Sequence, residues 1–319
     1  MSPAAPLPRV ASVDCGTNSI RLLVADVAPD GTLRDVVRRM EIVRLGQDID
    51  RTGVIAPEAM ERTLEATRDY AAQCRELGAE RVRFVATSAS RDARNAADFV
   101  AGVRDAFGDL DVAPEVVAGD AEAWFSFAGA TGDLTAHGIP GPYLVVDLGG
   151  GSTELVRGTT DVEAARSVDV GSVRMTERHL HSDPPTADQV EAARADVRAA
   201  LDVVEETVDL TGIGAVVGLA GSITTITAHA LGLSAYDPTR IHLARIPVDR
   251  HREACRSLLA MSHTSRAALG FMHPGRVDVI GGGALVWHEV LDRVVGRSPA
   301  AAVVTSEHDI LDGIALSLV

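Results

Sequence analysis

The chain contains no lysine, because all 30 of its basic residues are arginine. This absence excludes a P-loop lysine, a lysine Schiff base and a lysine general base. Any fixed cation beside a substrate phosphate must therefore be an arginine, a metal ion or a helix N-terminus. Aromatic residues are also scarce, at 3% of the 319 residues, so a stacking platform for a nucleobase is difficult to assemble. Trp124 and Phe125 are the candidates for such a platform.

Cysteines and membrane-spanning signals are equally sparse. The three cysteines, Cys15, Cys74 and Cys255, are odd in number and have no metal-like spacing, which predicts a reducing, cytoplasmic location. The N-terminus lacks the apolar core of a signal peptide. Residues 210–236 carry no charge, but glycines divide them into a strand, a turn and a helix. We expect buried core there rather than a membrane span.

Basic residues are fewer than acidic ones, with 30 against 45, and the formal net charge is −15. General nucleic-acid binding needs a basic surface, so nucleic acid is not an expected partner. A hydrophobic content of 46% is typical of a soluble globular enzyme. The chain is longer than a single hydrophobic core usually supports, which favours two domains.

One pattern occurs twice, in residues 14–23 and 147–156. Each copy has Asp first, Gly two positions on, Ser five on, a charged residue seven on and then two apolar residues. Each follows an apolar run and predicts a strand, a tight glycine turn and a second strand. Successive N–H groups in such a turn form a concave anion site. We expect two equivalent half-molecules with a cleft between them that binds a phosphate chain and a metal ion.

Strands and helices alternate along both halves, which predicts an α/β fold. The first half reads as a domain over residues 1–135, joined by a capped C-terminal helix at 306–319 that packs back on it. The second domain covers residues 136–305. The Gly-, Thr- and Pro-rich residues 129–142 are the expected hinge.

Local signals set several element boundaries. We expect strands at 34–43, 81–86, 115–118 and 216–219, a polar loop at 87–92, and helices at 57–78, 95–107 and 120–127. Another helix should begin after Thr186, because Gln189 completes a capping box. Helices with glycine at the N-terminus are expected to begin at Gly221-Ser222 and at Gly281–Gly283. For Gly281–Gly283, relief of steric crowding at a helix start is an equal alternative to ligand contact.

Three segments together resemble the exopolyphosphatase and guanosine pentaphosphate phosphohydrolase (Ppx/GppA) family. They are Thr87–Asn95, Gly119–Ala123 and Asp147–Glu154, and the resemblance runs from about residue 10 to residue 318. It implies a two-domain actin-like (ribonuclease H-like) phosphotransferase fold. It also implies hydrolysis of terminal phosphoanhydrides with a divalent cation, Mg²⁺ or, as the alternative, Mn²⁺.

The resemblance places the catalytic glutamate at Glu122. The family has two adjacent acidic residues in this segment, and the second of them matches Glu122. At the first position this sequence has Ala121, and it has Asp120 one position earlier. On a helix, positions 120 and 122 point about 200° apart, so both cannot face the same site.

Further roles follow from the resemblance and from phosphate chemistry. Arg91 is the second expected catalytic residue, because an arginine guanidinium can donate two hydrogen bonds to one phosphate group. The expected metal ligands are Asp147, Glu154 and Asp14. The expected phosphate-binding residues are Gly16, Asn18, Ser19, Arg21, Gly149, Gly150, Ser152, Gly221 and Ser222.

The sequence is compatible with several alternative functions. The first is an exopolyphosphatase acting on inorganic polyphosphate, and the second is a 5′-phosphohydrolase of guanosine pentaphosphate. An actin-like kinase or ATPase would need an adenosine pocket, and a polyphosphate-binding sensor would need no catalytic acid. A homodimer is left open.

Other chemical readings have simpler explanations. Cys15 could be a nucleophile, but as the neighbour of Asp14 it should point to the opposite face. The pair His308-Asp309 is similar to a metal-binding dipeptide but reads as a helix cap. A zinc site at His179, His181 and Asp183 is less favoured than a polar loop.

Overall fold

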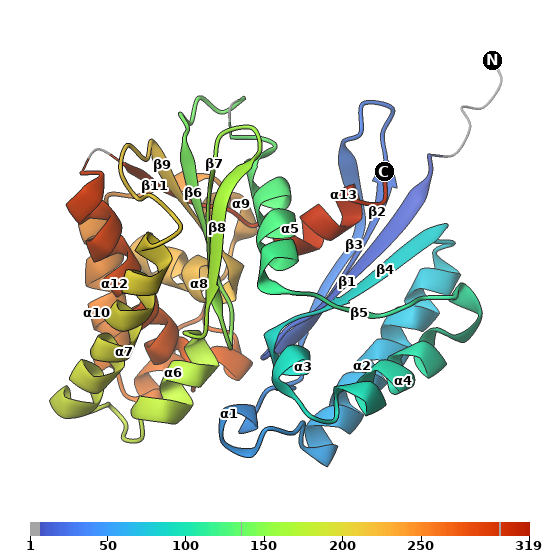
Figure 1. The fold of residues 1–319 in the computed structure, drawn as a ribbon, viewed down its shortest axis with the longest axis horizontal. Helices are drawn as coiled ribbons and strands as arrows, with labels where there is room; N and C mark the ends of the chain where they lie inside the picture. Colours follow the sequence, from blue (N-terminus) through green and yellow to red (C-terminus); the bar gives the residue numbers. More distant parts are fainter. Residues whose placement is uncertain (1–6, 135, 300) are drawn as a thin grey trace. The chain divides into compact units, whose positions relative to one another are not determined.

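The computed structural model describes residues 7–134, 136–299 and 301–319, which form two compact units (Figure 1). One unit comprises the described residues up to Ala118 together with Ile310–Val319, and the other comprises Gly119–Asp309. The boundary between the units therefore lies after Ala118 rather than after residue 135, as the sequence had indicated. The helix that begins at Gly119 belongs to the second unit.

A five-stranded mixed sheet forms the centre of the first unit. Its strands are β1 (Arg9–Cys15), β2 (Ser19–Val27), β3 (Leu33–Ile42), β4 (Arg81–Ala86) and β5 (Glu115–Val116). Their order is β3-β2-β1-β4-β5. The pairs β3–β2 and β2–β1 are antiparallel, and the pairs β1–β4 and β4–β5 are parallel. β1 is buried from Val10 to Cys15, as expected of a central strand that is covered on both faces.

Helices cover both faces of this sheet. They are α1 (Ile49–Thr52), α2 (Pro57–Glu76), α3 (Ser88–Asp92), α4 (Ala96–Phe107), the 3₁₀ turn η1 (Gly108–Leu110) and α13 (Ile310–Leu316). α2 and α4 pack on one face, where Tyr70 and Phe84 are fully buried. α13 packs on the other face through Leu311 against Leu23.

The C-terminal helix is joined to the first sheet by polar as well as apolar contacts. Ser12 Oγ donates to the Leu311 carbonyl over 2.8 Å, and Arg38 pairs with Asp312 over 2.5 Å. The expected packing of this helix on the first half is confirmed. Its expected start at residue 306 is wrong, because the Ser306 hydroxyl bonds locally to the His308 amide and carbonyl and the helix begins at Ile310.

A six-stranded mixed sheet forms the centre of the second unit. Its strands are β6 (Tyr143–Leu148), β7 (Thr153–Gly158), β8 (Val162–Val168), β9 (Ala215–Leu219), β10 (Ala244–Arg245) and β11 (Ala302–Thr305). The strand order is β10-β11-β9-β6-β7-β8. Read from β8, the order β8-β7-β6-β9-β11 repeats β3-β2-β1-β4-β5 in direction and pairing. The duplication in the sequence is therefore a duplication of sheet topology.

Helices also cover both faces of the second sheet. They are α5 (Gly119–Thr131), α6 (Ser172–His179), α7 (Ala187–Glu205), α8 (Ala220–Ala230), α9 (Pro238–Ile241), α10 (Val248–Ala260), α11 (His263–Ala267), η2 (Pro274–Arg276) and α12 (Ile280–Arg297). α5 packs on one face through Ala123 and Phe127. α6, α7, α8, α10 and α12 contribute to the larger core on the other face. The capping box of Thr186 and Gln189 at the start of α7 is confirmed.

Two local expectations are wrong. The polar segment 87–92 is a short helix, α3, rather than a loop, because it packs against β4 and α4 and buries Ser88 and Ser90. Residues 129–131 belong to α5 rather than to a hinge, because this apolar helix continues along the second sheet. The expected fold class, a two-domain α/β phosphotransferase fold with duplicated sheets, is confirmed. Within the described residues, no helix has the length and apolar character needed to cross a membrane.

A buried histidine makes the second core sensitive to acid. His251 on α10 is fully buried, and its Nδ1 accepts the indole N–H of Trp287 on α12 over 3.4 Å. Its Nε2 has no hydrogen-bond partner among the residues that the structure describes. Burial lowers the pKa of this imidazole to about 4. The folded chain therefore holds the ring neutral where the unfolded chain, with a pKa of about 6.5, binds a proton.

We predict that His251 contributes to the acid sensitivity of folding. Its stabilising contribution is complete above about pH 6.5 and is lost as the pH falls toward 4. Between pH 7 and pH 4.5, His251→Gln should lose about 2 kcal/mol less free energy of unfolding than the wild type. Urea unfolding at both pH values measures this, with the exposed His181→Gln as control. Equal losses in all three proteins would contradict the assignment.

Candidate phosphate-binding and catalytic residues

The first glycine turn joins β1 to β2 and is closed by one backbone hydrogen bond. The Gly16 amide donates to the Ser19 carbonyl over 2.9 Å. The Thr17 carbonyl accepts the Gly46 amide, and the Asn18 carbonyl accepts the amides of residues 43 and 44. The Thr17 and Asn18 amides, in contrast, donate to no group in the described part of the chain. With its carbonyls bound and its amides available, the turn is suited to an anion.

The second turn, between β6 and β7, has the same construction. The Gly149 amide donates to the Ser152 carbonyl over 3.0 Å. The first amides of α6 bind the Gly149 and Gly150 carbonyls, and Arg174 Nε donates to the Gly151 carbonyl over 2.7 Å. Across the described ranges, the amides of residues 150–152 have no acceptor. Three successive N–H groups of this kind form an anion nest.

Three polar side chains on these turns are also available to a ligand. Asn18, Ser19 and Ser152 make no side-chain hydrogen bond among the residues that the structure describes. Ser152 is only 2% exposed. A serine hydroxyl beside three available backbone amides can donate to the same anion, which favours a phosphate contact for Ser152.

The two copies of the motif carry opposite charges at one equivalent position. Asp14 on β1 lies directly opposite Arg21 on β2, and the two form an ion pair over 2.6 Å. In the second unit, Asp147 lies opposite Glu154 in the same register. These carboxylates are 6% and 1% exposed. The first copy pairs an acid with a base across the two strands, whereas the second has two buried acidic residues at the same positions, a set of oxygen donors that a divalent cation prefers.

Glu122 lies on the helix face that meets this carboxylate pair. One turn after it on α5, Ser126 Oγ donates to Asp147 Oδ2 over 2.5 Å. Positions i and i+4 share a helix face, so Glu122 points to the same side as Ser126. Glu122 is 7% exposed, whereas Asp120 is exposed to solvent. The separation of these two acids on α5 matches the expected helical geometry and favours Glu122 as the residue in the site.

A second hydroxyl supports the carboxylate pair from β8. Ser167 Oγ donates to Glu154 Oε1 over 2.6 Å. A Cβ on Gly119 would lie 2.5 Å from Ser167 Cβ, so only glycine lets the start of α5 approach β8 this closely. The sequence interpretation missed Ser126 and Ser167. The i, i+4 spacing from Glu122 could have indicated Ser126, but Ser167 has no local signal.

Arg91 lies on α3 in the first unit. Its Nη1 donates to the Val117 carbonyl over 3.1 Å, and Val117 precedes the chain's passage into α5. Nearby in the sequence, Ser88 and Thr17 share a hydrogen bond between their hydroxyls over 2.8 Å, which attaches α3 to the first turn. The structure thus links the segment around residue 91 to the first phosphate turn within that unit.

The N-terminus of α8 has a strained backbone. Ala220 has a φ of 65°, a left-handed value that costs a residue with a Cβ about 1–2 kcal/mol. A Cβ on Gly221 would lie 2.2 Å from the Arg276 guanidinium, which was not expected at this position. Ser222 is 7% exposed and its hydroxyl has no partner in the described structure. These features fit the expected phosphate contact at Gly221 and Ser222.

The three glycines at the start of α12 allow close packing. A Cβ on Gly282 would lie 2.5 Å from the Ser172 carbonyl of α6, and one on Gly283 would lie 2.6 Å from Ser222 Oγ of α8. The N-termini of α6, α8 and α12 therefore meet near the second turn. The simpler explanation for these glycines, relief of crowding, has direct support.

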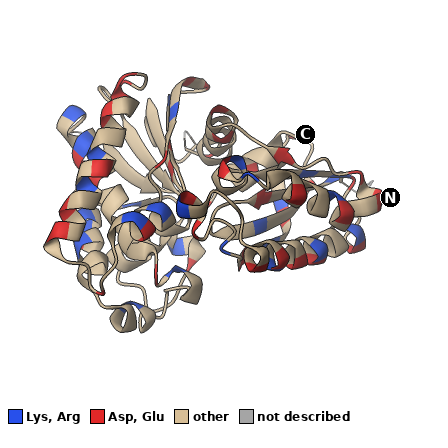
Figure 2. Ribbon diagram, turned by 60° about the horizontal axis from the view of Figure 1, so that its bottom comes forward, with Lys and Arg blue, Asp and Glu red and all other residues tan. Residues whose placement is uncertain are grey.

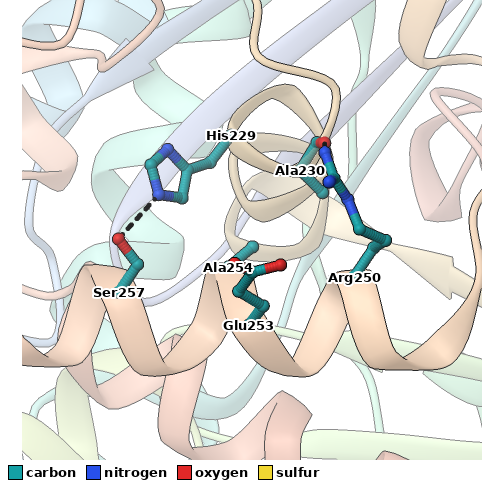
Figure 3. A pocket seen from close by; sticks show the side chains of 6 residues that line it. All are labelled: His229, Ala230, Arg250, Glu253, Ala254 and Ser257. Atoms are coloured by element: carbon teal, nitrogen blue, oxygen red, sulfur yellow. Dashed lines mark hydrogen bonds between the residues drawn. The ribbon is translucent and has the colours of Figure 1, made fainter.

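A separate cavity of about 170 Å³ lies at the opposite end of α8 (Figure 3). His229 accepts or donates a 3.0 Å hydrogen bond with Ser257, and Arg250 donates to the Ala230 carbonyl. Residue 229 is about 12 Å along the helix from Gly221, given a rise of 1.5 Å per residue. This cavity is therefore distinct from the glycine turns, and Arg250 caps the helix C-terminus there.

Basic and acidic residues are interspersed along the described helices. Acidic and basic residues alternate along the surface helices (Figure 2), and many arginines are held by carboxylates, such as Arg198 by Glu289. The negative overall balance is thus combined with turns whose backbone amides are available to an anion. Burial, reinforced by Asp14, raises the pKa of the Cys15 thiol well above its usual value, which opposes a nucleophilic role for it.

Sequence comparison finds relatives that match most of the chain. Exopolyphosphatase 2 of Mycobacterium tuberculosis is 51% identical over 317 residues, covering 98% of this chain and 99% of that protein. The guanosine-5′-triphosphate,3′-diphosphate pyrophosphatase of Vibrio cholerae is 30% identical over 227 residues, covering 71% of this chain and 44% of that protein.

Solved structures agree with this relationship. A crystal structure of an exopolyphosphatase-like protein is 45% identical and has a TM-score of 0.93, covering 98% of this chain and 97% of its own. The PPX-GPPA enzyme of Aquifex aeolicus is 27% identical with a TM-score of 0.78, covering 98% of this chain and 100% of its own. The model of the Ppx/GppA phosphatase family matches residues 23–318. With this match and the duplicated turns, the chain belongs to the Ppx/GppA phosphatase family.

Proposed function

We propose that the protein is an exopolyphosphatase that hydrolyses the terminal phosphoanhydride of inorganic polyphosphate and releases orthophosphate. The observation that carries the proposal is the pair of turns whose carbonyls are bound and whose amides at Thr17, Asn18 and residues 150–152 are available to an anion. Such turns recognise phosphate oxygens and require no base. The full-length similarity to a mycobacterial exopolyphosphatase supports the same substrate.

A divalent cation fits the second unit. Asp147 and Glu154 supply oxygen donors, are buried, and lie opposite one another across β6 and β7. Mg²⁺ prefers oxygen ligands from one or two carboxylates together with phosphates and waters, and Mn²⁺ accepts similar donors. When bound, the cation would neutralise charge on the phosphate oxygens. Asp14 is a weaker candidate ligand because Arg21 already binds its carboxylate.

Glu122 is proposed as the base that orients and deprotonates the attacking water. Phosphoryl transfer to water needs in-line positioning, neutralisation of the phosphate oxygens and such a group. Ser126 holds Asp147 one turn along the same helix, so α5 fixes the base relative to the carboxylate pair. The loop amides and Ser152 would bind the equatorial oxygens. Asn18, Ser19, Arg21 and Arg91 remain proposed phosphate contacts of the first unit.

Guanosine pentaphosphate is the second candidate substrate, because a Vibrio cholerae pyrophosphatase named for this type of nucleotide is also similar. Trp124, which is 49% exposed on α5, is the aromatic residue best placed to stack on a base. The amide turns account for phosphates alone, so the polyphosphate assignment is preferred. All three cysteines are free and buried, in agreement with the proposed cytoplasmic location.

We predict that inorganic polyphosphate is hydrolysed with a higher kcat/KM than guanosine pentaphosphate. Phosphate release is measured with Mg²⁺ on polyphosphates of several lengths, on guanosine pentaphosphate and on ATP. The physical reason is that the amide turns contact only phosphate oxygens. Faster cleavage of guanosine pentaphosphate than of every polyphosphate length would reverse the preference between the two substrates.

Glu122→Gln should retain the fold and polyphosphate binding but lose about a hundredfold or more in kcat, the contribution expected of a general base. The matched control is Asp120→Asn, which removes the exposed carboxylate two residues earlier and should remain active. Near-normal turnover in Glu122→Gln combined with an inactive Asp120→Asn would transfer the role to Asp120. Circular dichroism and a polyphosphate-binding assay verify that each variant is folded.

Asp147→Asn should raise the Mg²⁺ concentration needed for half-maximal activity, because a neutral amide is a poorer ligand than a carboxylate. A variant at the equivalent position of the first unit, Asp14→Asn, provides the comparison. Since Asp14 is already paired with Arg21, its loss should alter the metal requirement less. An unchanged Mg²⁺ titration for Asp147→Asn would remove this residue from the metal site.

A further inference from the structure

Three ligand-type side chains from distant segments meet in the second unit, away from the carboxylate pair of β6 and β7. Asp133 follows the end of α5, His242 follows α9, and His308 lies between β11 and α13. One potential ligand atom of each residue lies within 4.8 Å of the others. We call Asp133, His242 and His308 the histidine cluster.

The spacing of the histidine cluster is close to that of a coordination sphere. His308 Nδ1 and Asp133 Oδ2 are 3.6 Å apart, and the two imidazole rings have centroids 4.5 Å apart. A tetrahedral zinc ion with bonds of about 2.0–2.1 Å places its ligands about 3.4 Å from one another. Asp133 and His308 are both partly exposed, so their side chains have room to rotate toward such a geometry.

A comparison with a second group of similar composition shows why the histidine cluster stands out. His288, Glu289 and Asp292 also lie within ligand distance of one another on α12. There, however, Glu289 pairs with Arg194 and Arg198, and Asp292 pairs with Arg252. Those carboxylates are already neutralised by arginine.

Asp133 has no such arginine partner. Within the described ranges, His308 is the one basic side chain within 4.0 Å of its carboxylate. No competing cation therefore has to be displaced from Asp133 before a metal ion binds.

The ring of His242 is oriented by the backbone. Its Nδ1 accepts the Glu307 amide over 3.2 Å. A metal bound at Nδ1 would take the lone pair that this amide now uses. A metal bound at Nε2 would require the ring proton to move to Nδ1, where it would oppose the same amide. In either case, metal loading breaks this one neutral hydrogen bond, so the amide of Glu307 is a local marker of loading.

We propose that the histidine cluster is a binding site for a borderline divalent transition metal of the zinc type. Two imidazoles and one carboxylate are ligands that suit Zn²⁺, whereas Mg²⁺ prefers oxygen donors. The site is distinct from the Mg²⁺ position proposed at Asp147 and Glu154. Metal binding would fasten the segments that follow α5 and α9 to the segment that precedes α13.

The test is a calorimetric titration of tag-free protein with ZnCl₂ in excess Mg²⁺. The wild type should bind one Zn²⁺ per chain, and zinc should raise its Tm. His308→Gln and Asp133→Asn should each weaken binding by about tenfold or more, since each removes one of three protein ligands. His181→Gln, which removes an exposed histidine elsewhere on the same unit, should bind zinc like the wild type.

Two further readouts make the outcome decisive. The amide resonance of Glu307 should shift on zinc addition in the wild type and in His181→Gln, but not in His308→Gln. Absence of zinc uptake by the wild type would overturn the proposal, as would an equal loss of affinity in His308→Gln and His181→Gln. Polyphosphate hydrolysis is not used as the readout, so failure here leaves the proposed exopolyphosphatase activity unaffected.

Discussion

A single backbone hydrogen bond, from the first glycine amide to the serine carbonyl, closes each of the two phosphate turns. It is formed by Gly16 and Ser19 in one unit and by Gly149 and Ser152 in the other. With the turn closed, neighbouring amides can bind its carbonyls while its own N–H groups remain available to an anion. Those neighbours come from the segment after β3 in the first unit and from α6 in the second. The proposed phosphate chemistry depends on this arrangement.

The strand register determines which charged residues lie beside each turn. Pairing of β1 with β2 places Asp14 opposite Arg21, and pairing of β6 with β7 places Asp147 opposite Glu154. One difference in sequence, arginine against glutamate, gives an internal ion pair in one copy and two buried carboxylates in the other. This difference is the reason why the proposed cation site is assigned to the second copy of the motif.

Helix α5 carries the proposed general base and contacts the carboxylate pair of β6 and β7. Its N-terminal glycine permits close contact with β8, and its serine at position 126 binds Asp147. Glu122 lies one turn earlier on the same face. The apolar residues Ala123 and Phe127 of the same helix pack on the sheet. The orientation of the proposed base is thus maintained by core packing as well as by polar contacts.

Sequence patterns alone determined the parts that depend on local chemistry. The repeated Asp–Gly–Ser spacing predicted both turns and their flanking strands, and helical periodicity separated Glu122 from Asp120. The absence of lysine restricted phosphate binding to amides, arginines and metal. Tertiary structure decided the partners that lie far apart in the chain, including Ser167 with Glu154, Arg276 with Gly221, and the meeting of His242 with His308. It also extended α5 and shortened the last helix, because packing against a sheet and a local serine turn override composition. Long-range contacts of this kind have no local sequence signal, since they depend on how strands are ordered in each sheet.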